Sequence, residues 1–526
     1  MSVSQSTEQN LLRRVNVGDM LTRTAARSPG ALALVDGRRR WTWRELDARV
    51  NQIAHGLIRD GYRPDDRIAV MSGNTAEFLI TYYACAKAGV VAVPINLGWN
   101  TDQTAYVLRH SGVTGIVVAA DLLGAALDAI REVDTVTDVI VVGDEMLDIG
   151  RRCRRFDDLA ADREDAPAVV IGDDCPVQCL YTGGTTSRPK GVLGSHLAVY
   201  LESLAIAVEW SFSDRDRLAC MMPLFHTAQL NLFCTPAVAV GATMVLLPSF
   251  DAARLLDTIE EFGVTIIFGL PMMYRELLGR DDITTRDVST LRLAVYGMAP
   301  MPADELRRAI ELLGCDLSLM FGQTEMSPVT TIFRPEHQLS HSGAVGTPTV
   351  NTQVAIMDYD GGLLESGRTG EIVYRGPQLM NGYLDDDAAT ADACRNGWFH
   401  SGDLGHFDDD GILWFDDRTK DVIKTGGENV ASIEVELALY AAEPAIREVA
   451  VIGLPHERWG EAITAVAVPR PGHQLDGGTI RHKVKAHLDG FKVPKDVIVR
   501  AELPKTSTGK VQKNLLRQEH AAHYSG

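Results

Sequence analysis

Helical and strand-like segments alternate along this sequence from its start, and no other feature constrains the fold as strongly. Amphipathic helices are predicted at 17–26 and at 43–59, where Thr42 precedes the first turn, and a further helix is predicted at 75–88. Short apolar strands are predicted between and after these helices, at 67–71, 90–94, 115–119 and 138–142. Such alternation is typical of parallel sheets covered by helices.

The same pattern resumes in the middle of the chain and then changes in character. Further strands are predicted at 217–222, 242–247, 264–269 and 291–296. From about Leu404 the chain has short strands with Asp-Gly turns, such as 408–411. The C-terminal part resembles a small α+β unit, with strands predicted at 449–452, 462–468 and 497–500 and a helix at 478–488.

A chain of 526 residues is too long for one ordinary hydrophobic core. We therefore predict a multidomain α/β protein. Its large N-terminal domain, residues 1–419, contains two helix-covered sheets and a smaller β-rich lobe. Its C-terminal domain, residues 420–526, is a small mobile α+β lid.

The composition excludes several classes of protein. A net charge of −19 argues against nucleic acid or an anionic membrane as the main partner, since both require a basic surface. Residues 1–10 are polar and lack the apolar core of a signal peptide. The nearly apolar run at 234–247 is broken by Pro236 and Gly241 and is too short to span a bilayer, so a buried hairpin or strand is predicted there. We expect a cytoplasmic protein without stable membrane insertion.

The cysteines and one basic run could each form a functional site, but the sequence favours a non-functional role for both. The eight cysteines follow no repeated spacing, and Cys175 and Cys179 lack a second ligand pair, so reduced thiols are favoured over a zinc site. The basic run at 151–155 has acidic residues beside it that cancel its field. A solvated connector is therefore favoured there over a nucleotide-phosphate patch.

The loop YTGGTTSRPKG at 181–191 indicates polyphosphate binding. Its glycines allow backbone N–H groups to approach an anion, its threonines add hydroxyl donors, and its lysine adds a positive charge. It is not a Walker loop, because no Gly-Lys-Ser/Thr follows four residues after a glycine. This difference favours a use of ATP other than simple hydrolysis.

Further motifs follow this loop in a fixed order: PLFH at 223–226, YGMAP at 296–300, FGQTE at 321–325, WFHSGD at 398–403, DRTKD at 417–421, GGEN at 426–429 and PKTSTGK at 504–510. Together they resemble the adenylate-forming superfamily of acyl-CoA synthetases, nonribosomal adenylation domains and firefly luciferase-type enzymes. The resemblance covers nearly the whole chain. It implies that a carboxylate attacks the α-phosphate of ATP, giving acyl-AMP and pyrophosphate.

The resemblance implies a nucleotide site built from several motifs. The β- and γ-phosphates would be held by the loop, through Thr182, Gly183, Gly184, Thr185, Thr186 and Lys190. Thr324 would donate to the α-phosphate, and Glu325 would ligate Mg²⁺, a hard cation that favours carboxylate oxygen. The adenine would lie against Gly297, Met298, Ala299 and Pro300 and stack on Phe321, with Gly322 and Gln323 beside it. Asp403 and Arg418 would bind the ribose.

The C-terminal motifs imply a movement between two half-reactions. Lys510, in a Ser-Thr-Gly-Lys turn, would reach both the carboxylate and the α-phosphate. Lys420 lies at the hinge of the family, where the backbone would absorb a rotation of the lid. After this rotation the loop at Gly426 and Gly427 would replace Lys510 and leave a narrow passage for a thin acceptor such as pantetheine.

His226 admits three roles. It would gate the acyl pocket, help to position the acceptor nucleophile, or pack as an ordinary ring at the mouth of the pocket. We favour the gating role, and we do not assign His226 as a general base.

The chain departs from the family pattern at four positions. Gly183 stands where relatives usually have serine, and Ser187 stands where they usually have glycine. Phe321 replaces a more common tyrosine, and Ser401 replaces threonine. None of these changes involves Asp403, Glu325 or Lys510, so the chemistry is expected to be retained.

The acid and the acceptor are less constrained than the activation step. Methionines at 298, 301, 320 and 326 favour an apolar acid of small to medium size, and fatty, aryl and alicyclic acids all remain open. CoA is the favoured acceptor. The first alternative is an amide-forming ligase, in which an amino acid or other amine attacks the adenylate directly. A non-catalytic nucleotide sensor is the alternative from another class, and retention of Lys510 argues against it. We expect a monomer or homodimer.

Overall fold

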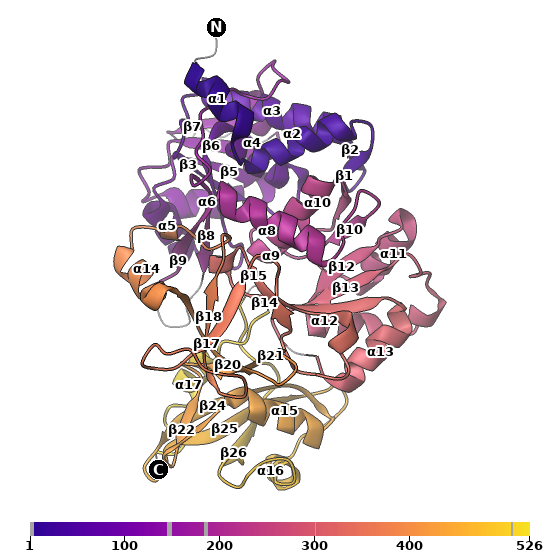
Figure 1. Cartoon of the computed structure of the whole chain (residues 1–526), viewed down its shortest axis with the longest axis vertical. Helices are drawn as coiled ribbons and strands as arrows, with labels where there is room; N and C mark the ends of the chain where they lie inside the picture. The colour runs from indigo at the N-terminus through magenta and orange to yellow at the C-terminus, as the bar shows by residue number, and fades with distance from the viewer. Residues whose placement is uncertain (1–4, 145–149, 183–187, 300, 507–508, 526) are drawn as a thin grey trace. The chain divides into compact units, whose positions relative to one another are not determined.

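The computed structural model describes residues 5–144, 150–182, 188–299, 301–506 and 509–525. The chain divides into two compact units. The first unit comprises residues 1–183, 189–354 and 374–399, and the second comprises residues 184–188, 355–373 and 400–526. Figure 1 shows the elements of both units coloured along the chain.

A nine-stranded sheet forms one layer of the first unit. Its strands lie in the order β16 (Thr347–Pro348), β15 (Val329–Phe333), β14 (Asp316–Gly322), β13 (Leu293–Tyr296), β12 (Ile266–Gly269), β10 (Arg217–Cys220), β11 (Thr243–Leu246), β1 (Leu32–Asp36) and β2 (Arg39–Thr42). The pairs from β14 to β1 are parallel, whereas β15, β16 and β2 are antiparallel at the edges.

An eight-stranded sheet forms a second layer. Its strands lie in the order β19 (Gly382–Tyr383), β9 (Lys190–Ser195), β8 (Pro176–Thr182), β4 (Val91–Pro94), β3 (Arg67–Met71), β5 (Gly115–Ala119), β6 (Asp138–Val142) and β7 (Arg152–Arg155). The pairs from β8 to β7 are parallel, and β9 and β19 extend the sheet in antiparallel fashion.

Helices cover these sheets, as the alternation in the sequence predicts. They are α1 (Gln5–Arg13), α2 (Val17–Arg27), α3 (Trp43–Arg59), α4 (Ala76–Ala88), α5 (Thr101–Ser111), α6 (Leu123–Ile130), α7 (Phe156–Leu159), α8 (His196–Glu209), α9 (Thr227–Gln229), α10 (Thr235–Val240), α11 (Ala252–Phe262), α12 (Pro271–Leu278), α13 (Ala303–Leu313) and α14 (Asp387–Ala393). Helix α3 begins where the sequence predicts, because Thr42 and Glu45 form a reciprocal capping box.

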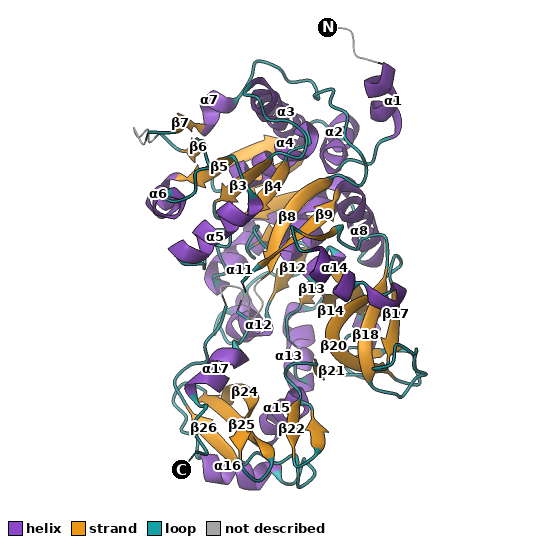
Figure 2. Cartoon of the chain, turned by 90° about the vertical axis from the view of Figure 1, so that its left-hand side faces the viewer, coloured by secondary structure: helices purple, strands orange, loops and turns teal. Residues whose placement is uncertain are grey.

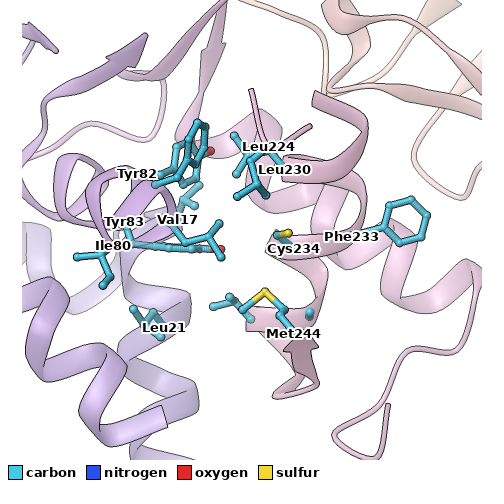
Figure 3. Packing of buried hydrophobic residues seen from close by; sticks show 14 of the residues in the cluster. Val17, Leu21, Ile80, Tyr82, Tyr83, Leu224, Leu230, Phe233, Cys234 and Met244 are labelled. Carbon is cyan, nitrogen blue, oxygen red and sulfur yellow. The ribbon is translucent and has the colours of Figure 1, made fainter. Parts of the chain in front are cut away.

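The main core of the first unit contains residues from both sheets and from helices α2, α3, α4, α8 and α10. In β3, Ile68 and Val70 join this core, whereas Ala69 and Met71 belong to a separate cluster with α5 and α6. Successive side chains of a strand point to opposite faces, so the eight-stranded sheet is covered on both faces. Figure 3 shows Tyr82 and Tyr83 of α4 within the main core.

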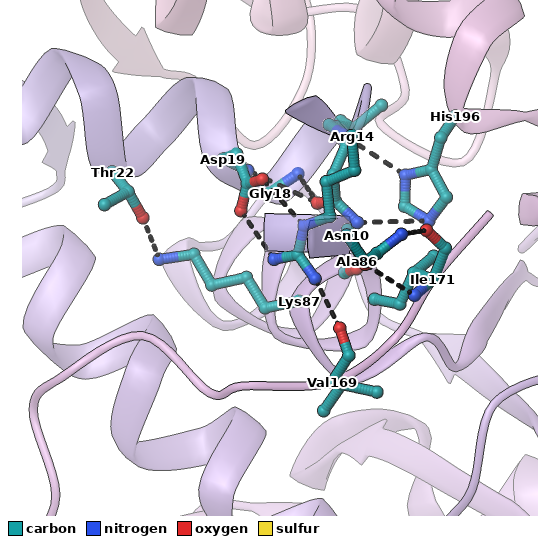
Figure 4. A network of polar contacts seen from close by, with 12 residues as sticks. Asn10, Arg14, Gly18, Asp19, Thr22, Ala86, Lys87, Val169, Ile171 and His196 are labelled. Atoms are coloured by element: carbon teal, nitrogen blue, oxygen red, sulfur yellow. Dashed lines mark hydrogen bonds and ion pairs between the residues drawn. The ribbon is translucent and has the colours of Figure 1, made fainter. Parts of the chain in front are cut away.

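A polar network lies beside this core, around the fully buried Lys87 of α4. Its Nζ donates to Thr22 Oγ1 over 2.8 Å and to Asn51 Oδ1 over 2.7 Å, and it forms an ion pair with Asp47. Figure 4 shows the Lys87–Thr22 bond close to the Arg14–Asp19 ion pair. Burial lowers the pKa of Lys87, and Asp47 opposes this effect. The network ties α4 to α2 and α3.

The second unit contains two smaller sheets. One has the order β17 (Gln353–Met357), β18 (Gly370–Arg375), β20 (Phe399–Phe407) and β21 (Leu413–Arg418), with β17 and β18 shared with the first unit. The other has the order β23 (Glu428–Val430), β22 (Ile423–Thr425), β25 (Gly460–Pro469) and β24 (Ile446–His456), and β26 (Asp496–Val499) also pairs with β25. Helices α15 (Ser432–Ala442) and α16 (Gly477–Val484) lie between these strands in the chain, and α17 (Lys513–Glu519) follows β26; Figure 2 shows all three.

The multidomain α/β fold is confirmed, and two local predictions need correction. The run at 234–247, predicted as a buried hairpin or strand, is a strand only at its end, in β11, and residues 235–240 form helix α10. Pro236 lies in the first turn of α10, where the missing N–H costs nothing. Helix α16 ends at Val484 rather than at residue 488, because the following backbone bonds span three residues, as from His487 N to Val484 O.

The structure also shows the conformation of the basic run at 151–155 and the state of the cysteines. The segment 152–155 is the edge strand β7 rather than a connector, and Arg154 forms ion pairs with Asp60 and Asp138. All eight cysteines are free thiols. Among the residues that the structure describes, no helix combines the length and the apolar character needed to cross a lipid bilayer.

Candidate active site

The polyphosphate loop connects the two strands of a β-hairpin. Thr182 ends β8 and lies opposite Lys190, the first residue of β9, in antiparallel register. This pairing brings the two ends of the loop together. Gly183, Gly184, Thr185 and Thr186, which the sequence assigns to phosphate binding, lie outside the described residues, as does Ser187.

Tyr383 links this hairpin to Glu325. Strand β19 pairs with β9, and this places the Tyr383 ring 4.6 Å from Lys190 Nζ. The Tyr383 hydroxyl donates to Oε1 of Glu325 over 2.9 Å. Burial, and then the charge of Glu325, raise the pKa of Tyr383, so the phenol keeps its proton and acts as the donor. The structure thus brings together the lysine of the loop and the carboxylate expected to hold Mg²⁺.

The adenine segment lies at the carboxyl ends of two parallel strands. Gly297, Met298 and Ala299 follow β13, and Phe321 and Gly322 end its neighbour β14. Ligands bind outside the carboxyl ends of strands in open α/β sheets. Pro300, the last residue of this predicted set, lies outside the described residues.

At this edge of the sheet, Gly297 is closely packed and Met298 has an uncommon backbone conformation. A Cβ atom on Gly297 would lie 3.0 Å from Cε and Cγ of Met320, so the strand ends pack closely. Met298 has a φ of 69°, an uncommon conformation for a non-glycine residue, and its side chain is half exposed. The segment therefore presents its backbone and the Met298 side chain at the edge of the sheet.

Thr324 and Glu325 lie in a short 3₁₀ turn between β14 and β15. The amide of Gln323 donates to Pro328 O over 2.8 Å and closes the base of this turn. Met380 N also donates to Glu325 O over 2.7 Å. The side chains of Gln323, Thr324 and Glu325 are half-buried. The turn therefore presents both catalytic candidates from a backbone fixed on two sides.

His226 caps the short helix α9. Its Nδ1 accepts from Ala228 N over 3.2 Å. Burial lowers the pKa of His226 to about 4, so the ring is neutral at neutral pH and Nε2 carries the proton. A ring in this state has no free basic nitrogen.

In the second unit, the two ribose candidates are cross-strand neighbours. Asp403 of β20 pairs with Arg418 of β21, and Asp403 Oδ1 lies 3.3 Å from Arg418 Nε. The Asp403 side chain is 7% exposed, and Asp403 N donates to Ser401 Oγ over 3.0 Å. The serine that replaces threonine at 401 thus retains a structural hydroxyl.

Lys510 belongs to the same charged cluster as Asp403 and Arg418. It closes a turn in which Thr506 N donates to Lys510 O over 2.8 Å, and Lys510 N donates to Thr506 Oγ1 over 3.1 Å. Burial, and then the positive charges of Arg418 and Lys420, lower the pKa of Lys510 to about 7, although Asp403 and Asp421 oppose this shift. Ser507 and Thr508 of this motif lie outside the described residues.

Lys420 lies in the turn that leaves β21. Asp421 N donates to Arg418 O over 2.8 Å, and Arg517 of α17 binds Asp421 over 2.9 Å. Burial and Arg418 lower the pKa of Lys420. One contact spans this turn, because Asp417 before it accepts from Ser432 N after it. Lys513 donates to Ser432 Oγ over 2.6 Å on the same side.

Gly426 and Gly427 form the two-residue turn between β22 and β23. Their φ angles are 62° and 89°, and such turns require positive φ at both positions. No heavy atom lies within 4 Å of a Cβ built on Gly427. The local reason for these glycines is therefore backbone conformation rather than crowding.

The residues around Glu325 fit a magnesium ion bound together with a nucleotide. Mg²⁺ is usually held by one or two carboxylates together with substrate phosphates and water. Among the described residues there is no cluster of three or more His, Cys, Asp and Glu side chains that would form a protein cage for a metal. A single carboxylate beside the end of a phosphate loop agrees with the first arrangement.

Sequence reasoning missed Tyr383. It lies in no motif recognised from the sequence, and its partners Lys190 and Glu325 are far from it along the chain. Only the pairing of the short strand β19 with β9 reveals the contact. The Gly-Tyr pair at 382–383 is the one local signal for it.

Comparisons with known proteins agree with this arrangement. The family model "AMP-binding enzyme" matches residues 21–384, and "AMP-binding enzyme C-terminal domain" matches residues 434–510. A feruloyl-CoA synthase from Amycolatopsis sp is 34% identical over 508 residues, covering 96% of this chain and 99% of the relative. The long-chain-fatty-acid–CoA ligase FadD13 of Mycobacterium tuberculosis is 34% identical over 513 residues, with 96% and 99% covered.

A solved structure is similar over the same length. The crystal structure of ATP-bound MatB from Rhodopseudomonas palustris has a TM-score of 0.88 and 29% identity, covering 97% of this chain and 100% of that one. The family models cover most of the chain, and the curated relatives match it from end to end. The chain therefore belongs to the AMP-binding enzyme family and is an adenylate-forming ligase that joins a carboxylic acid to CoA at the expense of ATP.

Proposed function

We propose that the chain activates an apolar carboxylic acid of small to medium size and that the residues described above take the following roles. The observation that carries the proposal is the cluster of Lys510, Asp403 and Arg418 in the second unit. A lysine is useful in catalysis when it lies near groups that bind the same ligand. Here the catalytic lysine shares its surroundings with the two residues expected to bind ribose.

In the first half-reaction, an oxygen of the acid attacks the α-phosphorus of ATP and pyrophosphate leaves. Lys510 donates to the carboxylate and to an α-phosphate oxygen, where negative charge develops. Thr324 donates to the same phosphate. Mg²⁺ held by Glu325 and by phosphate oxygens would offset the charge of the leaving group.

The leaving pyrophosphate is held by the loop. Lys190 and Thr182, at the two ends of the hairpin, bind the β- and γ-phosphates together with Gly183, Gly184, Thr185 and Thr186. Tyr383 keeps the Glu325 carboxylate in a fixed orientation through its hydroxyl. The contact of its ring with Lys190 supports the position of the ammonium group.

The base and the acyl group use the edge formed by β13 and β14. The adenine lies on the backbone of Gly297, Met298, Ala299 and Pro300 and stacks on Phe321, with Gly322 and Gln323 beside it. The acyl group extends toward His226, whose neutral ring gates the pocket without taking a proton. Relatives named for feruloyl and long-chain fatty acids favour an aryl or fatty acid as the substrate.

In the second half-reaction, the thiol of CoA attacks the acyl carbonyl and AMP leaves. The lid, residues 420–526, rotates about Lys420, so that Lys510 withdraws and the turn at Gly426 and Gly427 takes its place. We place the domain boundary between residues 419 and 420. The protein works in the cytoplasm, without membrane insertion, as a monomer or homodimer.

The test is acid-dependent pyrophosphate release over a panel of aryl, fatty and alicyclic acids, with CoA or mixed amino acids as acceptors. A CoA thioester product is expected. A product that forms only with an amine, as an amide, would overturn the choice of acceptor. Lys510→Ala is expected to lower pyrophosphate release at least about 100-fold while ATP still binds. Lys505→Ala is the matched control, since Lys505 precedes the same turn and pairs with Glu448 over 2.8 Å.

A further inference from the structure

Glu202 is a fully buried carboxylate in the middle of α8. Its Oε1 accepts from Val329 N over 3.0 Å, and its Oε2 accepts from Asn351 Nδ2 over 3.2 Å. Among the residues that the structure describes, both donors to Glu202 are neutral amide groups, and neither is a cation. A buried carboxylate without a cation is costly, and here burial raises the pKa of Glu202 to about 8. The burial of Glu202 without a cation therefore requires a structural or functional explanation.

Val329 is the first residue after the turn that carries Thr324 and Glu325. The base of this turn is held by the bond from Gln323 N to Pro328 O, 2.8 Å long. A Cβ atom on Gly322 would lie 2.1 Å from Pro328 O, so the two ends of the turn are in close contact. Glu202 binds the very next amide, and it therefore anchors the end of the turn from the core side.

A second carboxylate on the same helix shows what an ordinary structural contact looks like here. Glu209, two turns after Glu202, accepts from Val350 N over 2.8 Å. Its side chain is 1% exposed and is neutralised by Arg334 over 2.6 Å. Both glutamates bind a backbone amide of the same region. Only Glu202 binds next to the turn, and only Glu209 has a cation.

We propose that Glu202 is a positioning residue for ATP activation, which fixes the turn bearing Thr324 and Glu325 through the amide of Val329. The inference rests on the proposed function, in which Thr324 and Glu325 contact the α-phosphate and Mg²⁺. Glu202 itself touches neither ligand. Without it, the Val329 amide loses its buried acceptor, and the turn relaxes at the end that Glu202 holds.

The test compares Glu202→Ala and Glu202→Gln with Glu209→Gln as the matched control. We expect Glu202→Ala to weaken the equilibrium binding of a non-hydrolysable ATP analogue with Mg²⁺ by about 10- to 100-fold, as loss of outer-shell partners commonly does. Glu202→Gln keeps an oxygen acceptor for Val329 N and is expected to restore most of this affinity. Glu209→Gln is expected to lower the Tm while leaving nucleotide affinity unchanged.

Calorimetric titration gives the affinities, and circular dichroism at the same temperature gives the folded fraction of each variant. If Glu202→Ala binds the nucleotide as tightly as the wild type, or loses no more affinity than Glu209→Gln, the inference is overturned. If Glu202→Ala does not fold, Glu202→Asp takes its place, because the shorter side chain withdraws the acceptor from Val329 N. A KM for ATP that rises in Glu202→Asp but not in Glu209→Gln supports the inference, and equal KM values overturn it. Failure of the proposed function is a separate result, because the wild type would then bind nucleotide yet release no pyrophosphate with any acid.

Discussion

Tyr383 donates its hydroxyl hydrogen bond to Oε1 of Glu325 over 2.9 Å, across 58 residues of sequence. This bond orients a carboxylate that we propose to ligate Mg²⁺. Because the bond holds Oε1, it also fixes the direction of the other carboxylate oxygen of Glu325. A contact of this kind is expected to matter for the metal more than for the acid.

Tyr383→Phe is therefore expected to raise the Mg²⁺ concentration needed for half-maximal pyrophosphate release by roughly 10-fold. The ring that faces Lys190 is retained, so the KM for the acid should not change. Tyr383→Leu removes both contacts and should be more severe than Tyr383→Phe. Equal magnesium dependence in Tyr383→Phe and the wild type would contradict the role given to this hydroxyl.

Lys510 gives a prediction on pH. Its pKa is lowered to about 7, so the free enzyme loses the ammonium charge as the pH rises through that value. Since kcat/KM reports the ionisation of free enzyme, kcat/KM for ATP is expected to fall above about pH 7. Bound phosphates raise the pKa of the lysine, so kcat should keep its value to higher pH.

Lys510→Arg provides the control for this profile. A guanidinium group stays charged throughout this range, so the affinity of the variant for ATP should lack the decline above neutral pH. ATP affinities measured by calorimetry across the range would decide, even if the variant turns over slowly. An unchanged decline in Lys510→Arg would assign the ionisation to another group.

The fold was predicted well where the signals are local, and less well where distant partners decide. Helix α3 matches its predicted span because Thr42 and Glu45 specify its first turn. Strand β24 was predicted over 449–452 but runs from Ile446 to His456, because β25 pairs with it along its whole length. The sequence around 449–452 contains no local signal that predicts this pairing.

The candidate site follows the same rule. Asp403, Arg418 and Lys510 were found from ordered motifs, and they do belong to one charged cluster. Tyr383 and Glu202 were not predicted from the sequence, because the role of each depends on a hydrogen-bond partner more than 50 residues away. Residues that orient catalytic groups from a distance carry no spacing that a single sequence displays.

Glu202 gives a prediction on stability. The pKa of Glu202 rises from 4.5 to about 8 on folding, because burial and the charge of Glu209 outweigh the donors at Val329 and Asn351. The native state therefore favours the protonated acid. Between about pH 4.5 and 8 the unfolded chain releases this proton and the native chain keeps it, so this contribution to stability falls as the pH rises.

Glu202→Gln removes this titration. The Tm of the variant relative to the wild type is expected to increase steadily over that pH window and to level off above it. Glu209→Gln, which removes a carboxylate paired with Arg334, should not show this trend. A difference in Tm that is independent of pH would mean that Glu202 is already ionised in the folded protein.

Lys87 tests the polar network of the first unit. Lys87→Ala leaves Asp47 without its buried cation and is expected to lower the free energy of unfolding by about 3 kcal/mol. Urea unfolding of the first unit, followed by tryptophan fluorescence, would measure the loss. Adding Asp47→Ala to Lys87→Ala should recover part of it, because the stranded carboxylate is then gone.

The bond between Asp417 and the amide of Ser432 joins two segments that flank Lys420. In the proposed cycle, a rotation about Lys420 does not leave both partners in place, so this bond would break once and re-form once in each turnover. The first amide of α15 would then lose a charged acceptor at each turnover. The bond thus favours the arrangement in which Lys510 interacts electrostatically with Asp403, and in the proposed cycle its loss adds to the free-energy cost of the rotation. In the proposed cycle, the contact at the start of α15 therefore has to break before the thiol acceptor can replace Lys510.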